Sequence, residues 1–366
     1  MSKRHRPGVS AASVLRHVEE VVLATSGEDT FELVFAIAAA RLDGGVKGAA
    51  KVPALRAAIA DVAARRTTLD VAPTLAVPDE LIAKIDALLR SAFAGRQGVA
   101  VLDAVFESLV PRVAKSDKGQ FFTPRHVVDF VIDMLAPKRG ELVVDPACGS
   151  GAFLAHARAR AKGVRAEGFD IDLRAVRVAR LLALAGGAAP ESIGRGDGLR
   201  KQASPADVVA TNPPFAGRAA AGGFEVAKLV RTPERDILFL ERALDLLKPD
   251  GRLGIVLPYN KANGTAYVAV RRWLFQRARV FAVVGLPRET FLPHTSQRTF
   301  VLFAKRRGRA LASTERTMFV TSERAGKDVA GEPIYKDDVL DHDLAEVRAT
   351  LGPFLRTEGF FRKSGA

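Results

Sequence analysis

Four consecutive residues near the middle of the chain combine hydrogen-bond acceptors, a stiff backbone and an aromatic ring: Asn212, Pro213, Pro214 and Phe215. Each proline fixes its own φ and holds the preceding residue extended. The Asn212 side-chain oxygen and the Pro213 carbonyl oxygen could accept both N–H bonds of an aromatic amine and direct its lone pair at a methyl donor. Phe215 could stack on a flipped base, a contact worth about 1–3 kcal/mol. The structural alternative is a proline-rich strand exit with Phe215 in the core.

A loop of small residues could hold the methyl donor. It follows Asp145, the last residue of an apolar run, and contains Ala147, Gly149 and Gly151. Glycines let a ligand approach backbone N–H groups at a helix start. Asp170 ends the next apolar run, where a carboxylate would accept from ribose hydroxyls. The loop lacks the third glycine of a dinucleotide fingerprint, which favours S-adenosylmethionine. The alternative is an ordinary glycine turn, with Asp170 as a helix cap.

Cys148, the single cysteine, follows alanine and not proline, which disfavours the Pro-Cys chemistry of cytosine C5 methylation. We expect it to be a buried packing residue. One cysteine excludes an internal disulfide and a cysteine-cluster metal site, and the six histidines show no paired ligand spacing. We therefore predict no metal.

The elements that must position these residues are short apolar runs alternating with helical stretches. Strands are predicted at 141–145, 164–170, 206–211, 251–257, 280–286 and 299–304, with a short one just before Gly194. This alternation indicates an α/β fold with a mostly parallel, doubly wound sheet of seven strands. Too few residues separate the last two strands for a helical crossover, so we expect the final strand to be antiparallel.

The first 110 residues or so contain no convincing strand. Apolar residues at helical spacing begin at Val14, and further helices are predicted near 30–42, 54–65, 79–94 and 99–110. We predict a helical N-terminal domain over 1–112, a catalytic domain over 113–308 and a short C-terminal extension over 309–366. The extension should hold a strand at 317–321 and a helix near 342–356.

Composition narrows the classes of partner. The chain has 366 residues, 48% of them hydrophobic, a formal charge of +14 and a pI near 10.2. Such charge favours a polyanionic partner, because each neutralised phosphate releases counterions. A basic proteome is the alternative explanation. The sequence lacks an apolar membrane span and a signal peptide, so we expect a cytoplasmic protein that does not bind membranes.

Six ordered motifs carry a resemblance to a known family. They are GQFFTP from Gly119, DPACGSGAFL from Asp145, GRGDGL from Gly194, NPPF from Asn212, GRLGIVLP from Gly251, and a late motif with Leu286-Pro287 and FLPHT from Phe291. Together they resemble the N6-adenine DNA methyltransferases of the type I restriction-modification kind, in the modification subunit. The resemblance spans roughly 119–308.

The resemblance implies a Rossmann-like class I methyltransferase that uses S-adenosylmethionine, and it implies a role for each motif residue. The methionine end of the cofactor would be lined by Phe121, Phe122, Thr123 and Pro124. Asp145 would lie under its amino group, Asp170 at its ribose and Asp197 at its adenine amine. A simple Gly-Asp-Gly turn is the alternative for Asp197. The family usually has glutamate where Asp170 stands, which preserves the carboxylate.

The resemblance also implies partners. DNA would be the substrate, and a restriction or defence protein could accompany the enzyme. Only about 58 residues follow Gly308, which is little for a target-recognition domain, so we expect a separate specificity subunit.

Two basic clusters could contact DNA phosphates or belong to solvated surfaces. One surrounds a small-residue loop at 219–223 and comprises Arg218, Lys228, Arg231 and Arg235. The other comprises Arg271, Arg272, Arg277 and Arg279.

Two other functions stay open. The chain could methylate a protein or RNA amide or amine, since release-factor glutamine methyltransferases use a similar Asn-Pro-Pro-Tyr site, or it could be a non-catalytic scaffold of the same fold.

Overall fold

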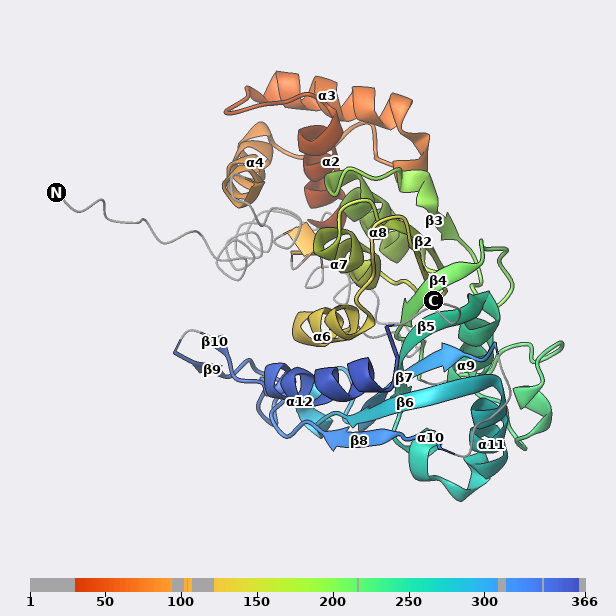
Figure 1. The fold of residues 1–366 in the computed structure, drawn as a ribbon. Coiled ribbons are helices and arrows are strands. Elements are labelled where there is room, and N and C mark those ends of the chain that lie inside the picture. The colour runs from red at the N-terminus through yellow and green to blue at the C-terminus, as the bar shows by residue number, and fades with distance from the viewer. Residues whose placement is uncertain are drawn as a thin grey trace. The chain divides into compact units, whose positions relative to one another are not determined.

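The computed structural model describes residues 30–93, 102–103, 105–106, 122–215, 217–308, 314–337 and 339–361 (Figure 1). These residues group into two compact units. Unit 1 comprises the described residues before Lys115 together with Asp172–Ile193, and unit 2 comprises those within Ser116–Ile171 and Gly194–Ala366. The predicted division at residues 112 and 308 stays a prediction. The predicted helix near Val14 and most of the one at 99–110 lie outside the described residues.

Unit 2 is built on one eight-stranded sheet with the order β3-β2-β1-β4-β5-β7-β6-β8. The seven predicted strands are all present: β1 (Leu142–Asp145), β2 (Arg165–Asp170), β3 (Ile193–Arg195), β4 (Ala206–Thr211), β5 (Leu247–Pro258), β6 (Ala278–Gly285) and β7 (Thr299–Arg306). The strand predicted in the C-terminal extension is β8 (Met318–Thr321), and it joins the same sheet beside β6.

Strand directions follow the expected pattern. β1 runs parallel to β2 and β4, and β4 runs parallel to β5. β7 lies between β5 and β6 and is antiparallel to both, as predicted from the short link before it. The carboxyl ends of β1, β2 and β4 therefore meet at one edge of the sheet.

Helices cover both faces of this sheet. They are α6 (Arg125–Leu135), α7 (Ala152–Arg160), α9 (Arg235–Leu246), α10 (Asn260–Asn263), α11 (Val268–Arg277) and α12 (Leu344–Thr357). Side chains alternate between faces along a strand. On β7, Leu302 joins the core that contains α9 and α11, whereas the neighbouring Phe303 contacts Phe130 of α6 at 5.8 Å between ring centroids. The sheet thus has two buried faces.

Unit 1 is helical and includes α2 (Thr30–Asp43), α3 (Val52–Arg65), α4 (Asp79–Phe93) and α8 (Leu173–Ala185). Asp172 caps α8 by accepting from the Ala175 N–H at 2.9 Å. Arg177 of α8 pairs with Glu32 at 2.6 Å, and its guanidinium lies 4.4 Å from the ring centroid of Phe35. A buried cation therefore joins α8 to α2.

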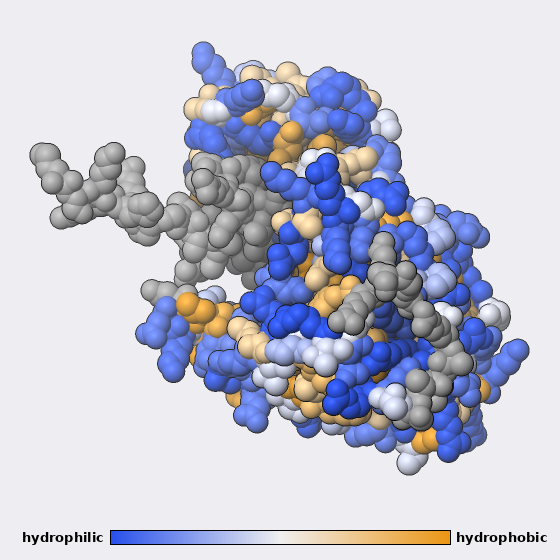
Figure 2. Space-filling model, in the orientation of Figure 1, coloured by the Kyte–Doolittle hydropathy of each residue, from blue (hydrophilic) through white to orange (hydrophobic). Residues whose placement is uncertain are grey.

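The C-terminal residues also form a small hairpin of β9 (Tyr335–Lys336) and β10 (Val339–Leu340) before α12. Its Tyr335 and Val339 are 62% and 67% exposed. Figure 2 shows orange residues among hydrophilic ones at the lower left of the coloured surface, in the region where Figure 1 labels β9 and β10. Within the described part of the chain, no helix is both long and apolar enough to span a bilayer.

Candidate active site

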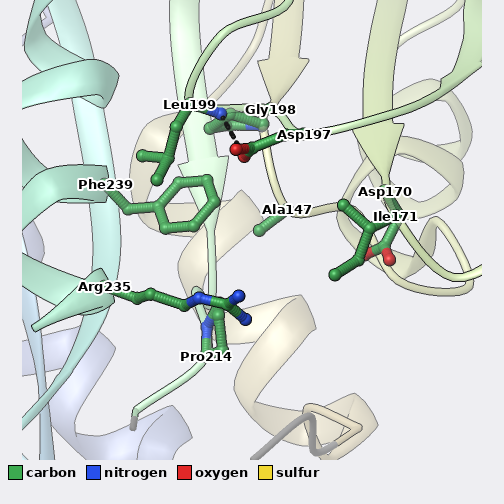
Figure 3. Close-up of a pocket in the computed structure, with 10 residues that line it drawn as sticks. Ala147, Asp170, Ile171, Asp197, Gly198, Leu199, Pro214, Arg235 and Phe239 are labelled. Atoms are coloured by element: carbon green, nitrogen blue, oxygen red, sulfur yellow. Dashed lines mark hydrogen bonds between the residues drawn. The ribbon is translucent and has the colours of Figure 1, made fainter. Parts of the chain in front are cut away.

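A pocket opens at the carboxyl ends of the parallel strands, within unit 2 (Figure 3). Four residues predicted for the site line it: Ala147, Asp170, Asp197 and Pro214. Six residues that were not assigned to the site from sequence also line it: Pro146, Ile171, Gly198, Leu199, Arg235 and Phe239. Segments separated by many residues in sequence thus converge on one pocket.

The loop after β1 is shaped by the carboxylate that ends β2. Gly149 has a φ of 51°, and its N–H donates to Asp170 Oδ2 at 2.9 Å. Gly151, with a φ of 83°, is the N-cap residue just before α7. These left-handed conformations favour glycine. Asp170 therefore holds the glycine loop while it also lines the pocket.

Asp145 lies behind the loop and is only 1% exposed. Its Oδ1 accepts from the Ala147 N–H at 3.0 Å. Burial, with a smaller contribution from the nearby Asp170 charge, raises the pKa of this carboxyl to about 7. A cation that reached Asp145 would favour its ionised form.

The Gly-Asp-Gly turn after β3 approaches the glycine loop very closely. A Cβ on Gly198 would lie 1.7 Å from the Pro146 carbonyl oxygen, so only glycine fits there. Asp197 is exposed, and its Oδ1 accepts from the Leu199 N–H at 3.0 Å, the bond dashed in Figure 3. The turn thus presents a carboxylate at the pocket edge.

The pocket has apolar walls that sequence reasoning missed. Ile171 follows β2, Leu199 follows the turn, and Phe239 lies on α9. Arg235 and Phe239 are four positions apart on this helix and therefore share a face. That spacing, soon after the proline segment, was the available signal, but the position of α9 against the sheet depends on tertiary packing.

The segment after β4 presents an unusual amide. Asn212 Nδ2 donates to Thr123 Oγ1 at 2.9 Å, whereas Asn212 Oδ1 is buried and has no hydrogen-bond partner among the described residues. A buried acceptor without a donor costs about 1–3 kcal/mol. An N–H group that donated to Asn212 Oδ1 would recover that free energy, so this oxygen favours the binding of a hydrogen-bond donor.

Phe215 is 4% exposed and meets Phe291 edge-on, with ring centroids 5.5 Å apart and planes at 81°. This contact fixes the plane of the Phe215 ring. Phe291 belongs to the late motif, so the structure brings two of the sequence motifs together.

Several predicted residues are not among those that line the pocket. They are Phe122, Thr123, Pro124, Asp145, Gly149, Gly151, Asn212, Pro213 and Phe215. Phe121 lies outside the described residues. Thr123 was predicted for the methionine end of the cofactor, and the structure adds its bond to Asn212.

The two basic clusters differ in how many of their arginines form hydrogen bonds or ion pairs with other residues of the chain. Arg271 donates to the Gly264 carbonyl at 2.8 Å, Arg277 pairs with Glu225, and Arg279 pairs with Glu358 at 2.6 Å. These three arginines therefore stabilise the fold. In the other cluster, Arg235 lines the pocket.

Metal-ligating side chains do not gather anywhere in the described ranges: no group of three or more histidine, cysteine, aspartate or glutamate residues could hold an ion there.

Comparisons with known proteins agree with this arrangement. A family model described as N-6 DNA Methylase matches residues 99–347. The chain is 30% identical over 209 residues to the type I restriction enzyme EcoEI methylase subunit of Escherichia coli, covering 50% of this chain and 42% of that protein. It is 29% identical over 235 residues to the EcoKI methylase subunit of E. coli K12, covering 55% and 44%. The alignments thus span less than half the length of these relatives.

Solved structures share the fold. A chain from a structure of type I R-M system assembly has a TM-score of 0.68 at 20% identity, covering 97% of this chain and 85% of that one. The type I restriction-modification methyltransferase subunit from Streptococcus thermophilus has a TM-score of 0.63 at 20% identity, covering 97% and 76%.

Proposed function

Because the chain belongs to the N-6 DNA methylase family, we propose that it is a site-specific, adenine-specific DNA methyltransferase that methylates the N6 amine of adenine with S-adenosylmethionine. The observation that carries this proposal is the buried Asn212 Oδ1, which lacks a partner among the described residues and lies at the carboxyl end of β4. The adjoining Pro214 lines the pocket. An acceptor waiting for an N–H donor beside a pocket is what amine methylation requires.

The residues at the pocket fit S-adenosylmethionine. Asp145 would face the ammonium group, Asp170 the ribose hydroxyls and Asp197 the adenine amine. Ile171 and Leu199 would provide apolar surface for the adenine ring, and Gly198 leaves room where a Cβ would clash. When bound, the cofactor supplies an electrophilic sulfonium methyl group. Phe121, Phe122, Thr123 and Pro124 would line its methionine end.

Asn212 and Pro213 would act on the target amine. The Asn212 Oδ1 and the Pro213 carbonyl oxygen accept its two N–H bonds, which draws the nitrogen towards tetrahedral geometry and frees its lone pair. The Thr123 hydroxyl fixes which amide atom faces the target, because Asn212 Nδ2 donates to it. A strong base is unnecessary, since the proton leaves after transfer.

The target adenine must leave the duplex to reach these acceptors. Phe215 would stack on the flipped base, and its edge contact with Phe291 keeps the ring plane fixed. Pro213 and Pro214 keep the segment rigid, so little conformational entropy is lost when the base arrives.

DNA and other subunits are the proposed partners. The net charge of +14 supplies affinity for phosphates. The relatives are named as methylase subunits of type I restriction enzymes, so we infer a modification subunit that works with a separate specificity subunit and a restriction partner. Methylation of a protein or RNA amide, or a purely structural role, is disfavoured by the family match.

The test is transfer of labelled methyl to native genomic DNA, RNA and cell protein in parallel, followed by nucleoside analysis. We expect label in N6-methyl-2′-deoxyadenosine from DNA and none in the other fractions. Label only in RNA or protein would reject the DNA substrate. An absence of transfer to all three, with the cofactor bound and a specificity subunit added, would support a scaffold role.

A further inference from the structure

Resting on the proposed function, we propose that Arg235 binds a DNA phosphate next to the flipped adenine and thereby positions the target nucleotide. Arg235 is the first residue of α9 and is half-buried. It is the one cationic residue among the described residues that line the pocket. Figure 3 shows its guanidinium beside Pro214, at the side of the pocket formed by the proposed catalytic segment.

The backbone holds Arg235 against the exit of that segment. The Arg235 N–H donates to the Gly217 carbonyl at 3.1 Å, and Arg218 and Glu234 form an antiparallel bridge just outside this bond. The arginine side chain lies along Gly217: a Cβ there would be 3.7 Å from Arg235 Cδ and 3.8 Å from Nε. Arg235 is therefore held against Gly217, which lies two residues after Phe215 in the chain.

An ion cluster holds the start of α9 in place. Lys261, 5% exposed at its side chain, pairs with Glu234 and lies 3.2 Å from Asp236 Oδ2. Tyr267 Oη donates to Glu234 at 3.0 Å. The two carboxylates that flank Arg235 in sequence are thus bound to Lys261. This cluster positions the helix start without involving the Arg235 guanidinium.

The charge of Arg235 is consequently left for a ligand. Among the described residues, no ion pair joins it to Asp170, Asp197, Glu234 or Asp236. A half-buried guanidinium is most stable with an anion that accepts its fixed N–H fork, and phosphate matches that geometry.

Two anions could reach the pocket in the proposed reaction, the cofactor carboxylate and a DNA phosphate. The carboxylate belongs to the methionine end, which the proposal places with Thr123 and Asp145. Arg235 instead shares the pocket with Asp197, at the adenine end, where the cofactor has no negative charge. The proposed function places the flipped base at Pro214 and Phe215, so a phosphate flanking that base would come close to Arg235. The phosphate is therefore the occupant we assign.

The experiment measures single-turnover methylation by the full chain of a short duplex with one extrahelical adenine, at increasing DNA concentration. Only duplexes whose adenine enters the site react, so the half-saturating DNA concentration reports on that complex. We expect Arg235→Gln to raise it about tenfold and to lower the salt slope of DNA binding by about 1. S-adenosylmethionine affinity, measured by calorimetry, should fall by a smaller factor than the half-saturating DNA concentration rises, because Arg235 borders the cofactor pocket at the end where the cofactor carries no negative charge.

Neutral methylphosphonates locate the contact. Placed at one of the two phosphates flanking the adenine, the substitution should weaken the wild-type complex about tenfold and the Arg235→Gln complex hardly at all, because both changes remove the same interaction. Arg235→Lys should restore part of the loss. Arg165→Gln is the matched control, since Arg165 is exposed at the opposite end of β2 from Asp170, and it should behave as wild type.

Three results would overturn the assignment: half-saturation unchanged by Arg235→Gln, losses that add for both methylphosphonates, or weakened cofactor affinity with unchanged DNA half-saturation. The last would transfer Arg235 to the cofactor. Each presupposes that the wild-type chain methylates the adenine. A wild-type chain that methylates no adenine, with or without a specificity subunit, rejects the proposed function itself, and with it the role of Arg235.

Discussion

The two polar atoms of the Asn212 side chain have different environments, and this difference predicts the effect of replacing Asn212 with alanine. One atom is held by Thr123, and the other is a buried acceptor without a partner among the described residues. Asn212→Ala should lower kcat at least about 100-fold, as loss of one preorganised hydrogen-bonding group does in other enzymes. Cofactor affinity should change less than twofold, because the proposal places Asn212 at the target amine and not at the cofactor.

Single-turnover kinetics and calorimetric titration check the two halves of this prediction. Thr123→Ser should retain most of the activity, and Thr123→Val should lose part of it by freeing the Asn212 amide. Turnover near the wild-type rate in Asn212→Ala would remove Asn212 from the mechanism.

Asp145 predicts how cofactor binding depends on pH. Burial raises the pKa of Asp145 to about 7 in the free protein. An ammonium partner favours the carboxylate, so binding below pH 7 must release a proton. Apparent affinity for S-adenosylmethionine should therefore fall about tenfold for each pH unit below 7 and stay level above it.

Calorimetry from pH 5.5 to 8.5, in buffers of different ionisation enthalpy, counts the released proton. Asp145→Asn should bind more weakly, and its affinity should not depend on pH.

The same raised pKa of Asp145 makes the folded state hold a proton that the unfolded chain lacks between about pH 4 and 7. Its contribution to the free energy of unfolding thus falls as pH rises, and Asp145→Asn should be the more stable protein above pH 7 without cofactor. Equal wild-type affinity at pH 6 and 8 would contradict the ammonium contact.

At the scale of elements, the pocket depends on the close approach of two turns. Gly198→Ala would put a methyl group 1.7 Å from the Pro146 oxygen, so one turn must move. We expect a loss of about 1–3 kcal/mol in the free energy of unfolding and at least tenfold weaker cofactor binding.

Gly222→Ala is the matched control, because a Cβ there meets no atom within 4 Å. It should leave both the thermal midpoint and cofactor affinity unchanged. Wild-type cofactor affinity in Gly198→Ala would show that the two turns need not touch.

Most elements could be predicted because their signals are local. Apolar runs in the sequence predicted β1, β2, β4 and β7. The short link before β7 predicted that this strand is antiparallel. Carboxylates at strand ends could be assigned to one site because parallel strands end at the same edge. Phe239 and Leu199 could not be found this way, and Arg235 could be assigned only to a basic cluster, because all three reach the pocket through the packing of a helix and a turn. The order of the strands and the junction of β8 with β6 also depend on contacts remote in sequence.

At the scale of the whole molecule, the net charge provides affinity for DNA but no preference for a particular DNA sequence. The net charge of +14 attracts any duplex, but phosphate contacts carry no sequence information. The chain alone should bind DNA without sequence preference, with an affinity that falls on the order of 100-fold between 50 and 200 mM salt. Site-specific methylation should require an added specificity subunit.

Anisotropy titrations with unrelated duplexes, and mapping of methylated adenines with and without that subunit, would check this expectation. Methylation of one defined sequence by the chain alone at physiological salt would show that recognition is built into it.

Residues Asp172–Ile193 belong to unit 1 although part of unit 2 precedes them in the sequence. This order has a consequence for folding during synthesis. Helix α2 leaves the ribosome long before α8, whose Arg177 covers Phe31 and Phe35. At about 5–20 residues per second, the interval between residues 115 and 193 lasts on the order of 4–16 s. Throughout it, the aromatic face of α2 lacks the contact with Arg177, so we expect it to be accessible to chaperones. A gene split between these positions would strand α2 in one fragment and α8 in the other, so neither polypeptide could complete unit 1.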